Sequence, residues 1–500
     1  MKTKYAIINF ITSAFPALLI ALIGVVKIKV FLNFMGGETV GIYQMFAQFY
    51  AYISLLEAGI GASALYQLYK PIKEKNTKKL NSILSAIRTY FNKVAIIMII
   101  IGIILSFLLP NFISDLQNNR NYIQLCMIIY FVGSTISYFV YSYNLINRAE
   151  QKVYKNNIIY YVITIIKNIF EIVLICNGFN LLSLMVVHFI SSLIQNIWVY
   201  FQSKKDRGKI NFSKEKDYTF KKEMKNLLTA RIGNLIYNNI DMILLSKYVG
   251  MITVVKYTSY YYIFNIFSII ISQIGSALIP SIGDLLIENN KEKNHQILKE
   301  FNAIIFYFST ILILPLFYFI TPFVSMWYGE KYTVSNITLI FLIILFFINI
   351  IKIPLTSYMD SAGDFKTIKK CSIIESLLNL MLSIVLVQKY GIAGVAIGTI
   401  ISTIIGTFIF YPNIIYKKIL NRPRREYYLK IIKYITVILL NGVILYLLMQ
   451  KIEISNLLNW IIYGFIIFII NFTLTTLIYW KSNELSFLER FKNIINRKEK

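Results

Sequence analysis

Four polar residues lie on one face of a long apolar stretch of the sequence, residues 223–250. Arg231, Asn234, Asn238 and Asp241 follow one another at steps of three or four residues, and apolar residues occupy most of the positions between them. In a helix this spacing places all four side chains on one face. The helix would be about 42 Å long, enough to cross a hydrocarbon core of about 30 Å. Because polar side chains at that depth usually face a protein interior or a watery cavity, we predict that this face lines a substrate path.

Two of these residues have alternative interpretations. Arg231 lies about two helical turns inside the expected start of the helix, so its side chain either faces a cavity or extends back to the membrane surface. Asp241 is expected to pair with a lysine for stability. The alternative is that it titrates and couples transport to a proton or sodium gradient.

The composition indicates a membrane protein with many helices. Hydrophobic residues make up 57% of the chain, and apolar runs recur from end to end between short polar segments. The 51 Lys and Arg residues outnumber the 24 Asp and Glu residues. Most of these basic residues fall in loops between apolar runs, so membrane topology explains them and no nucleic-acid partner is expected. The three cysteines have no paired spacing and are predicted to be apolar fillers.

The apolar runs predict an all-α polytopic membrane protein with about 14 transmembrane helices. Basic loops and tails concentrate on one side, which places both termini in the cytoplasm. The expected parts are a six-helix lobe (1–203), a basic linker (204–222), a second six-helix lobe (223–416), a basic loop (417–427), an extra transmembrane hairpin (428–480) and a charged tail (481–500).

The two lobes repeat each other in sequence. A shift of 214 residues gives an ungapped alignment, and later in each half a glycine follows a conspicuous asparagine and lies in a short turn before the next helix. Because each repeat has an even number of helices, both enter the membrane from the same side and run parallel. The aligned pairs include Gly36 with Gly250, Thr39 with Thr253 and Tyr43 with Tyr257; the later pairs are Asn168 with Asn379 and Gly178 with Gly391.

Further charged residues fall within the expected helices. The repeat aligns Lys27 with Asp241, so the two could form an ion pair or line opposite walls of one cavity. Glu57 lies in the segment EAGIGASA and is a second candidate for ion coupling, since an unpaired carboxylate there is costly. Lys352, with Asn349 at i−3, is expected to face the interior and bind substrate; the alternative is that it extends to the membrane surface.

The fifth expected helix and the sixth contain the remaining interior polar residues. Lys167 and Glu171 stand four residues apart and can neutralise each other. His188 is predicted to be a hydrogen-bonded interior residue; the alternative is a proton relay. With His295 far away in the sequence, no metal site is expected.

Three segments carry a family resemblance: SLLEAGIGASAL (54–65), ARIGNLIYNNIDMILLSKYVG (230–250) and the run from DSAGDF to GTIIS (360–402). Together they resemble the polysaccharide transporter family, the O-antigen and capsule repeat-unit flippases of the MATE-like MOP superfamily. The resemblance implies two parallel six-helix repeats plus a C-terminal helix pair. It also implies a flippase that moves an undecaprenyl-diphosphate-linked oligosaccharide to the outer leaflet by alternating access.

A cationic cavity suits such a substrate, because desolvated phosphates and sugars cannot cross hydrocarbon unaided. Arginine can hold phosphate oxygens with its planar fork and stays charged in a partly dry site. The predicted substrate-binding residues are Arg231, Asn234, Asn238, Lys27 and Lys352.

Other functions on related architectures stay open. A MATE-type multidrug or cation exporter usually lacks the extra helix pair, and a cationic cavity suits cations poorly. A peptidoglycan-precursor lipid flippase can have fourteen helices, but the first two helices here offer Lys27, Lys29 and Glu57 in place of the arginines expected there.

A polysaccharide polymerase or ligase would need catalytic residues gathered in a large outer loop, and every expected outer loop is short. We therefore expect a transporter and not an enzyme, with no cofactor. The expected partners are the lipid-linked oligosaccharide and membrane lipids. Sugar transferases or a polymerase of the same pathway, and a proton or sodium counter-ion, are candidate partners.

Overall fold

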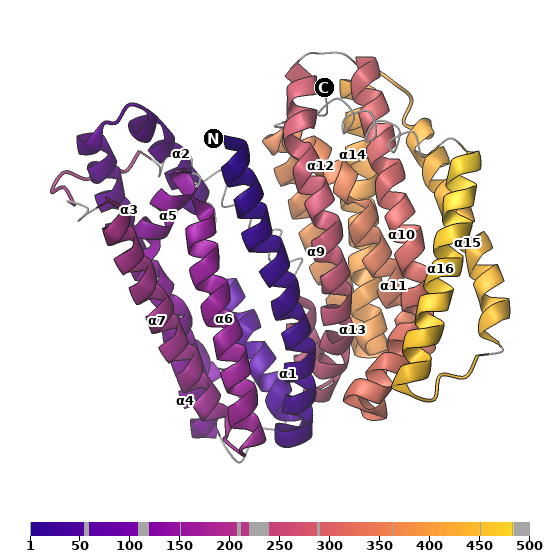
Figure 1. Ribbon diagram of the computed structural model, residues 1–500, viewed down its shortest axis with the longest axis horizontal. Helices are drawn as coiled ribbons and strands as arrows, with labels where there is room; N and C mark the ends of the chain where they lie inside the picture. The colour runs from indigo at the N-terminus through magenta and orange to yellow at the C-terminus, as the bar shows by residue number, and fades with distance from the viewer. Residues whose placement is uncertain are drawn as a thin grey trace. The chain divides into compact units, whose positions relative to one another are not determined.

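The structure is a computed structural model (Figure 1). It describes residues 2–54, 60–108, 120–150, 152–207, 212–219, 240–287, 291–362, 364–450, 452–482 and 484. Throughout these ranges the regular structure is helical, without a β-strand. The chain divides into two compact units, Met1–Tyr257 and Thr258–Lys500.

The first unit is a bundle of long helices. In it α1 packs along α6, and α4 packs along α7. Its elements are α1 (Lys2–Ile53), α2 (Ile60–Lys73), α3 (Thr77–Leu108), α4 (Arg120–Thr135), the 3-10 turn η3 (Ile136–Val140), α5 (Tyr141–Ala149), α6 (Val153–Cys176), α7 (Leu181–Arg207) and a helical segment over 240–248.

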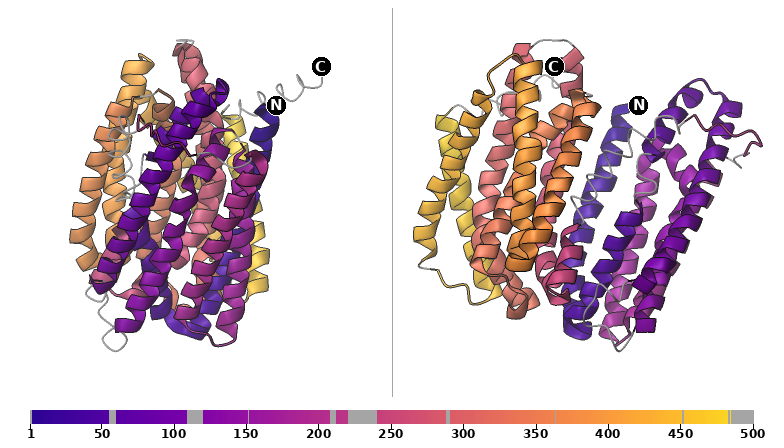
Figure 2. Two further views of the ribbon diagram at one scale, coloured as in Figure 1. Left: turned by 90° about the vertical axis from the view of Figure 1, so that its left-hand side faces the viewer. Right: turned by 180° about the vertical axis from the view of Figure 1, so that it is seen from behind.

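The second unit contains the C-terminal helix pair. There α10 packs against both α15 and α16, and α11 packs against α13 (Figure 2). Its elements are α9 (Met251–Ile287, which begins just before the unit), α10 (Lys291–Tyr328), the 3-10 turn η4 (Glu330–Tyr332), α11 (Asn336–Ile351), α12 (Ile353–Ala362), α13 (Phe365–Thr403), α14 (Phe410–Pro412) between the π-helical turns η5 (Ile404–Ile409) and η6 (Asn413–Ile419), α15 (Arg425–Met449) and α16 (Leu457–Lys481).

The helix count agrees with the sequence prediction. Within the described residues, 11 helical stretches are long and apolar enough to cross a membrane. Two of them contain a non-helical glycine, Gly36 and Gly391, so each comprises two of the expected helices. The expected helix over 223–250 is described only over 240–248. The all-α polytopic fold is therefore confirmed, while the domain boundaries stay predictions.

The glycines that the repeat aligns all have a positive φ. Gly36 and Gly250 have φ of 78° and 117°, and Gly178 and Gly391 have φ of 78° and 52°. Positive φ is readily adopted only by glycine, since a Cβ atom would clash with the backbone. Equivalent glycines thus turn the chain between helices in both halves of the sequence.

The outer surface of the bundles is apolar. On α6, for example, Ile166, Ile169, Phe170 and Val173 are each about half exposed, while Asn168 and Glu171 between them are buried. A helix in contact with lipid is expected to show this inverted pattern, because unpaired polar groups are costly in hydrocarbon. On this helix the polar residues therefore lie inside the bundle.

Candidate functional site

A buried lysine and carboxylate form the centre of the polar cluster in the first unit. Lys27 of α1 pairs with Glu171 of α6; their side chains are 9% and 0% exposed. The Lys27 ammonium also donates to Asn168 Oδ1 at 3.3 Å and to Tyr43 Oη at 3.4 Å. Because an isolated charge at this depth is very costly, the packing of α1 on α6 brings each charge its partner.

Aromatic rings complete the surroundings of Lys27. Its Nζ lies 5.0 Å from the centre of the Tyr43 ring and 5.6 Å from that of Phe31, distances at which a cation is attracted by the ring face. On the acidic side, Glu171 Oε1 has no hydrogen-bond partner among the described residues. Of the two carboxylate oxygens, only Oε2 therefore has a described hydrogen-bond partner.

A second polar group lies next to this cluster. His188 Nε2 and Ser134 Oγ are 2.9 Å apart, and Tyr50 donates its phenol hydrogen to the Ser134 carbonyl at 2.8 Å. The Tyr130 ring stacks on His188 at 4.6 Å and meets the edge of Tyr43 at 6.4 Å. The prediction that His188 is a hydrogen-bonded interior residue is confirmed.

The close approach of α4 and α7 depends on a glycine. A Cβ atom on Gly133 would lie 2.9 Å from the Cα atom of Phe189, a distance that real Cβ atoms essentially never show. The residue after this glycine is Ser134, which contacts His188 from α7. Small residues at helix contacts commonly serve this purpose in membrane proteins.

The partners of two charges differ from the sequence-based expectation. Glu171 forms its close ion pair with Lys27 of α1, while Lys167, one turn earlier on its own helix, interacts with the same carboxylate electrostatically from a greater distance. Among the described residues, the ion pair of Lys27 is with Glu171, and Lys27 and Asp241 form no ion pair. Sequence spacing reveals contacts along one helix, whereas these partners meet because two different helices pack together.

Asp241 is buried in the helical segment 240–248, with 6% of its surface exposed. Its Oδ2 accepts a hydrogen bond from Tyr257 at 3.2 Å, and its Oδ1 has no partner among the described residues. Lys27 and Tyr43 are the residues that the repeat aligns with Asp241 and Tyr257. The same side-chain contact therefore occurs in both repeats, with a lysine in the first and a carboxylate in the second.

Lys352 lies at the junction of α11 and α12 and is partly buried. Pro354 follows it and is buried. Because proline cannot donate a backbone hydrogen bond, it accounts for the break between the two helices. The role predicted for Lys352 in substrate binding stays a prediction. Arg231, Asn234, Asn238 and Glu57 lie outside the described residues, and their predicted roles also stay predictions.

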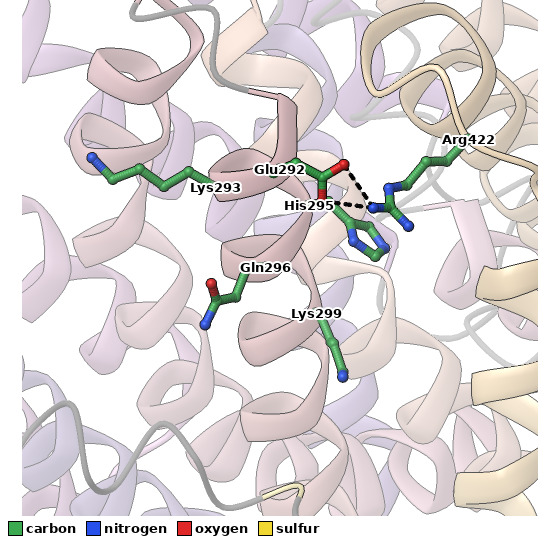
Figure 3. Close-up of a pocket in the computed structure, with 6 residues that line it drawn as sticks. All are labelled: Glu292, Lys293, His295, Gln296, Lys299 and Arg422. Carbon is green, nitrogen blue, oxygen red and sulfur yellow. Dashed lines mark hydrogen bonds and ion pairs between the residues drawn. The ribbon is translucent and has the colours of Figure 1, made fainter.

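A charged pocket of about 470 Å³ lies in the second unit, at the start of α10 (Figure 3). Arg422, in the loop before α15, donates from Nη2 to both carboxylate oxygens of Glu292 at 2.9 and 2.7 Å. His295 Nε2 lies 3.2 Å from Glu426 Oε2. The sequence signalled this region only as a basic loop, and the carboxylates that partner its arginine were missed. The pocket is lined by Glu292, Lys293, His295, Gln296, Lys299 and Arg422.

Sequence profiles of two families match this chain. The profile described as polysaccharide biosynthesis protein matches residues 8–286, more than half of the chain. The chain belongs to the polysaccharide biosynthesis protein family. The profile of the MatE family matches residues 227–385 of this family member. A comparison with curated protein sequences gave no match.

Solved structures share the fold of this polysaccharide biosynthesis family protein. The lipid II flippase MurJ, in an inward closed conformation, is 17% identical with a TM-score of 0.71, and the match covers 96% of this chain and 99% of that one. An inward-facing multidrug resistance MATE transporter is 14% identical with a TM-score of 0.64, covering 81% and 96%. A MOP superfamily transporter from Pyrococcus furiosus is 14% identical with a TM-score of 0.59, covering 81% and 94%. The protein thus has the MOP superfamily fold and crosses the membrane many times.

Proposed function

We propose that this protein is a flippase that moves undecaprenyl-diphosphate-linked oligosaccharide repeat units across the bacterial cytoplasmic membrane by alternating access. These units would serve the synthesis of a surface polysaccharide such as O-antigen or capsule. The observation that carries the proposal is the polysaccharide biosynthesis profile matched over residues 8–286. The fold supports it, since the match to the lipid II flippase structure spans nearly the whole of both chains.

The arrangement of polar groups is consistent with a transporter. Buried charges and amides occupy the interior of helices whose outer faces are apolar. Such an interior lowers the barrier for a polar headgroup, whereas the prenyl chain of the substrate can remain in lipid. We assign phosphate binding to Arg231 and Lys352 and further polar contacts to Asn234 and Asn238. Lys27 already pairs with Glu171. It can bind a phosphate only if its ammonium contacts both groups or breaks the ion pair.

A MATE-type exporter is the second candidate, favoured by the MatE profile over residues 227–385. The extent of the structural matches argues against it. The exporter structures cover 81% of the chain, whereas the lipid flippase structure covers 96%. The same comparison keeps a peptidoglycan-precursor lipid flippase as a third candidate. In each case Asp241 and Glu57 are the residues we propose for coupling to a proton or sodium gradient.

The test is a deletion of the gene in a strain without a second flippase. We expect surface polysaccharide to disappear and diphosphate-linked repeat units to accumulate in the inner leaflet. The wild-type protein should restore the polymer, and Arg231→Ala, at equal abundance in the membrane, should not. Arg148→Ala is the matched control, because Arg148 is an exposed arginine at the end of α5.

Other outcomes separate the candidate functions. If surface polymer and lipid intermediates are unchanged by the deletion, the proposal fails. Accumulation of the peptidoglycan precursor would instead identify a precursor flippase. Increased sensitivity to cationic drugs, with normal polysaccharide, would identify an exporter.

A further inference from the structure

Helix α10 contains two prolines, Pro315 and Pro322. A proline has no backbone N–H, so the carbonyl four residues earlier loses its helical donor. The affected carbonyls are those of Ile311 and Tyr318. In a membrane interior no water replaces the lost bond, and neighbouring helices commonly supply the missing donor.

Helix α16 supplies a donor at the first proline. The Asn471 side-chain nitrogen donates to the Ile311 carbonyl at 3.0 Å and to the Thr310 carbonyl at 2.9 Å. Ile311 carries the carbonyl that Pro315 leaves without a partner. Asn471 is fully buried, at 0% exposure, so this contact is shielded from any alternative partner.

Helix α16 also supplies a donor beside the second proline. Trp460 donates from Nε1 to the Phe319 carbonyl at 2.7 Å. Phe319 is the residue after Tyr318, whose carbonyl loses its donor through Pro322. Trp460 and Asn471 are about 16 Å apart along α16, at 1.5 Å per residue, so the two helices are joined at two separate levels.

Helix α15 fixes the orientation of Asn471. Asn441 of α15 donates to Asn471 Oδ1 at 3.2 Å and to Thr475 Oγ1 at 2.9 Å. Because Asn471 accepts from α15 through its oxygen, its nitrogen is directed at α10. Asn441, Asn471 and Thr475 are each 0% exposed. The C-terminal pair thus holds a buried amide network directed at the carbonyl that Pro315 frees, in which Asn441 Oδ1 alone has no described partner.

The C-terminal end of α16 is also bound to α15. Glu484, just after α16, pairs with Lys433 of α15 at 2.8 Å and accepts a hydrogen bond from Tyr434 at 2.9 Å. The Tyr434 ring stacks on Phe306 of α10 at 4.5 Å. Figures 1 and 2 show α15 and α16 running side by side, next to α10.

We propose that the C-terminal helix pair is a brace for α10. Asn471 satisfies the carbonyl that Pro315 frees, and Trp460 binds the Phe319 carbonyl beside the one that Pro322 frees. The helices α10, α15 and α16 therefore move as one rigid body. This inference concerns the second unit alone and does not depend on the transported substrate. It assigns Asn471 and Trp460 as positioning residues that hold α10 in shape at its two prolines.

A double-mutant cycle tests the brace in the full-length protein in lipid nanodiscs, with the thermal unfolding midpoint as readout. Asn471→Leu should lower the midpoint clearly in the wild-type background. In the Pro315→Ala background the helix regains its own donor, and the drop caused by Asn471→Leu should be less than half as large. Thr473→Val, on an exposed position of α16, is the control and should show no coupling to Pro315.

A second cycle uses a milder change, for the case that Asn471→Leu does not fold. Trp460→Phe keeps an aromatic ring and removes only the N–H donor and part of the ring. Its effect should be smaller in the Pro322→Ala background, where the N–H at position 322 again bonds the Tyr318 carbonyl and this turn depends less on the Trp460 contact. Equal drops with and without the prolines in both cycles would show that these residues only fill space and would overturn the proposal. No drop at all would overturn it too.

Discussion

Tyr257 donates its phenol hydrogen to Asp241 at 3.2 Å, as the equivalent pair in the first repeat, Tyr43 and Lys27, makes contact at 3.4 Å. Both pairs are 16 residues apart in sequence and span a positive-φ glycine. Each repeat therefore has a tyrosine next to a buried ionisable group, which is basic in the first repeat and acidic in the second. Lys27 has Glu171 as its counter-charge, whereas the only described partner of Asp241 is a neutral hydroxyl.

Removing the hydroxyl group of Tyr257 should destabilise the protein more than removing that of Tyr43. Tyr257→Phe removes the one hydrogen bond described for Asp241, and we expect a destabilisation of about 1–3 kcal/mol, the cost of an unsatisfied buried polar group. Tyr43→Phe should cost less, because Lys27 keeps Glu171 and Asn168. Denaturant unfolding of both variants in the same lipid gives the comparison. A larger loss for Tyr43→Phe would contradict this account.

The Lys27–Glu171 pair should show strong coupling. Lys27→Met removes the ammonium that forms the close ion pair with Glu171, and Glu171→Gln leaves the Lys27 ammonium without that pair; we expect each to cost about 3–5 kcal/mol. The double variant, Lys27→Met with Glu171→Gln, should recover much of that loss, since neither charge remains. Unfolding midpoints of the four proteins measure the coupling. Additive losses in the double variant would argue against a buried ion pair.

The contacts of Glu484 predict a dependence of stability on pH. Burial alone would raise the pKa of its carboxyl, but the hydrogen bond from Lys433, the charge of Lys430 and the hydrogen bond from Tyr434 together hold the pKa below its ordinary value of 4.5. A carboxyl with a lowered folded-state pKa stabilises the fold at pH values above its unfolded-state pKa. This stabilisation is lost as the pH falls through the folded-state pKa.

Glu484→Gln should therefore be less stable than the wild type at neutral pH and equally stable in strong acid. Thermal unfolding from neutral pH to below pH 4 provides the measurement. Glu453→Gln is the control, because Glu453 lies in the turn between α15 and α16 without a described ion pair. A difference between wild type and Glu484→Gln that stays constant over this range would contradict the ion-pair explanation.

Replacing glycine by alanine should have opposite effects on stability at a positive-φ position and inside a helix. Gly391→Ala should destabilise the protein by about 1–2 kcal/mol, because an alanine at φ of 52° is strained even though no atom lies within 4 Å of its Cβ. Gly24→Ala, inside α1 and also without a neighbour within 4 Å, should stabilise by up to about 1 kcal/mol through helix propensity. Unfolding measurements on the two variants check the sign. Destabilisation by both would show that packing, not φ, decides.

The sequence by itself determined the class of fold and much of the chain's organisation. Length and spacing of the apolar runs dictate membrane helices, since a bilayer core demands a fixed length of apolar helix. The repeat also paired Gly36 with Gly250 and Gly178 with Gly391, and all four adopt positive φ. These features are local: each depends on a residue and its neighbours along the chain, so the sequence is sufficient to predict them.

Only the tertiary structure decided which buried polar groups meet. Lys27 pairs with Glu171, 144 residues later, and Asn471 donates to a carbonyl 160 residues earlier. Sequence spacing suggested Lys167 for Glu171 and gave no hint of a partner for Asn471. In an apolar environment every charge and freed carbonyl must find a partner, but which helix provides it depends on how helices far apart in sequence pack against one another.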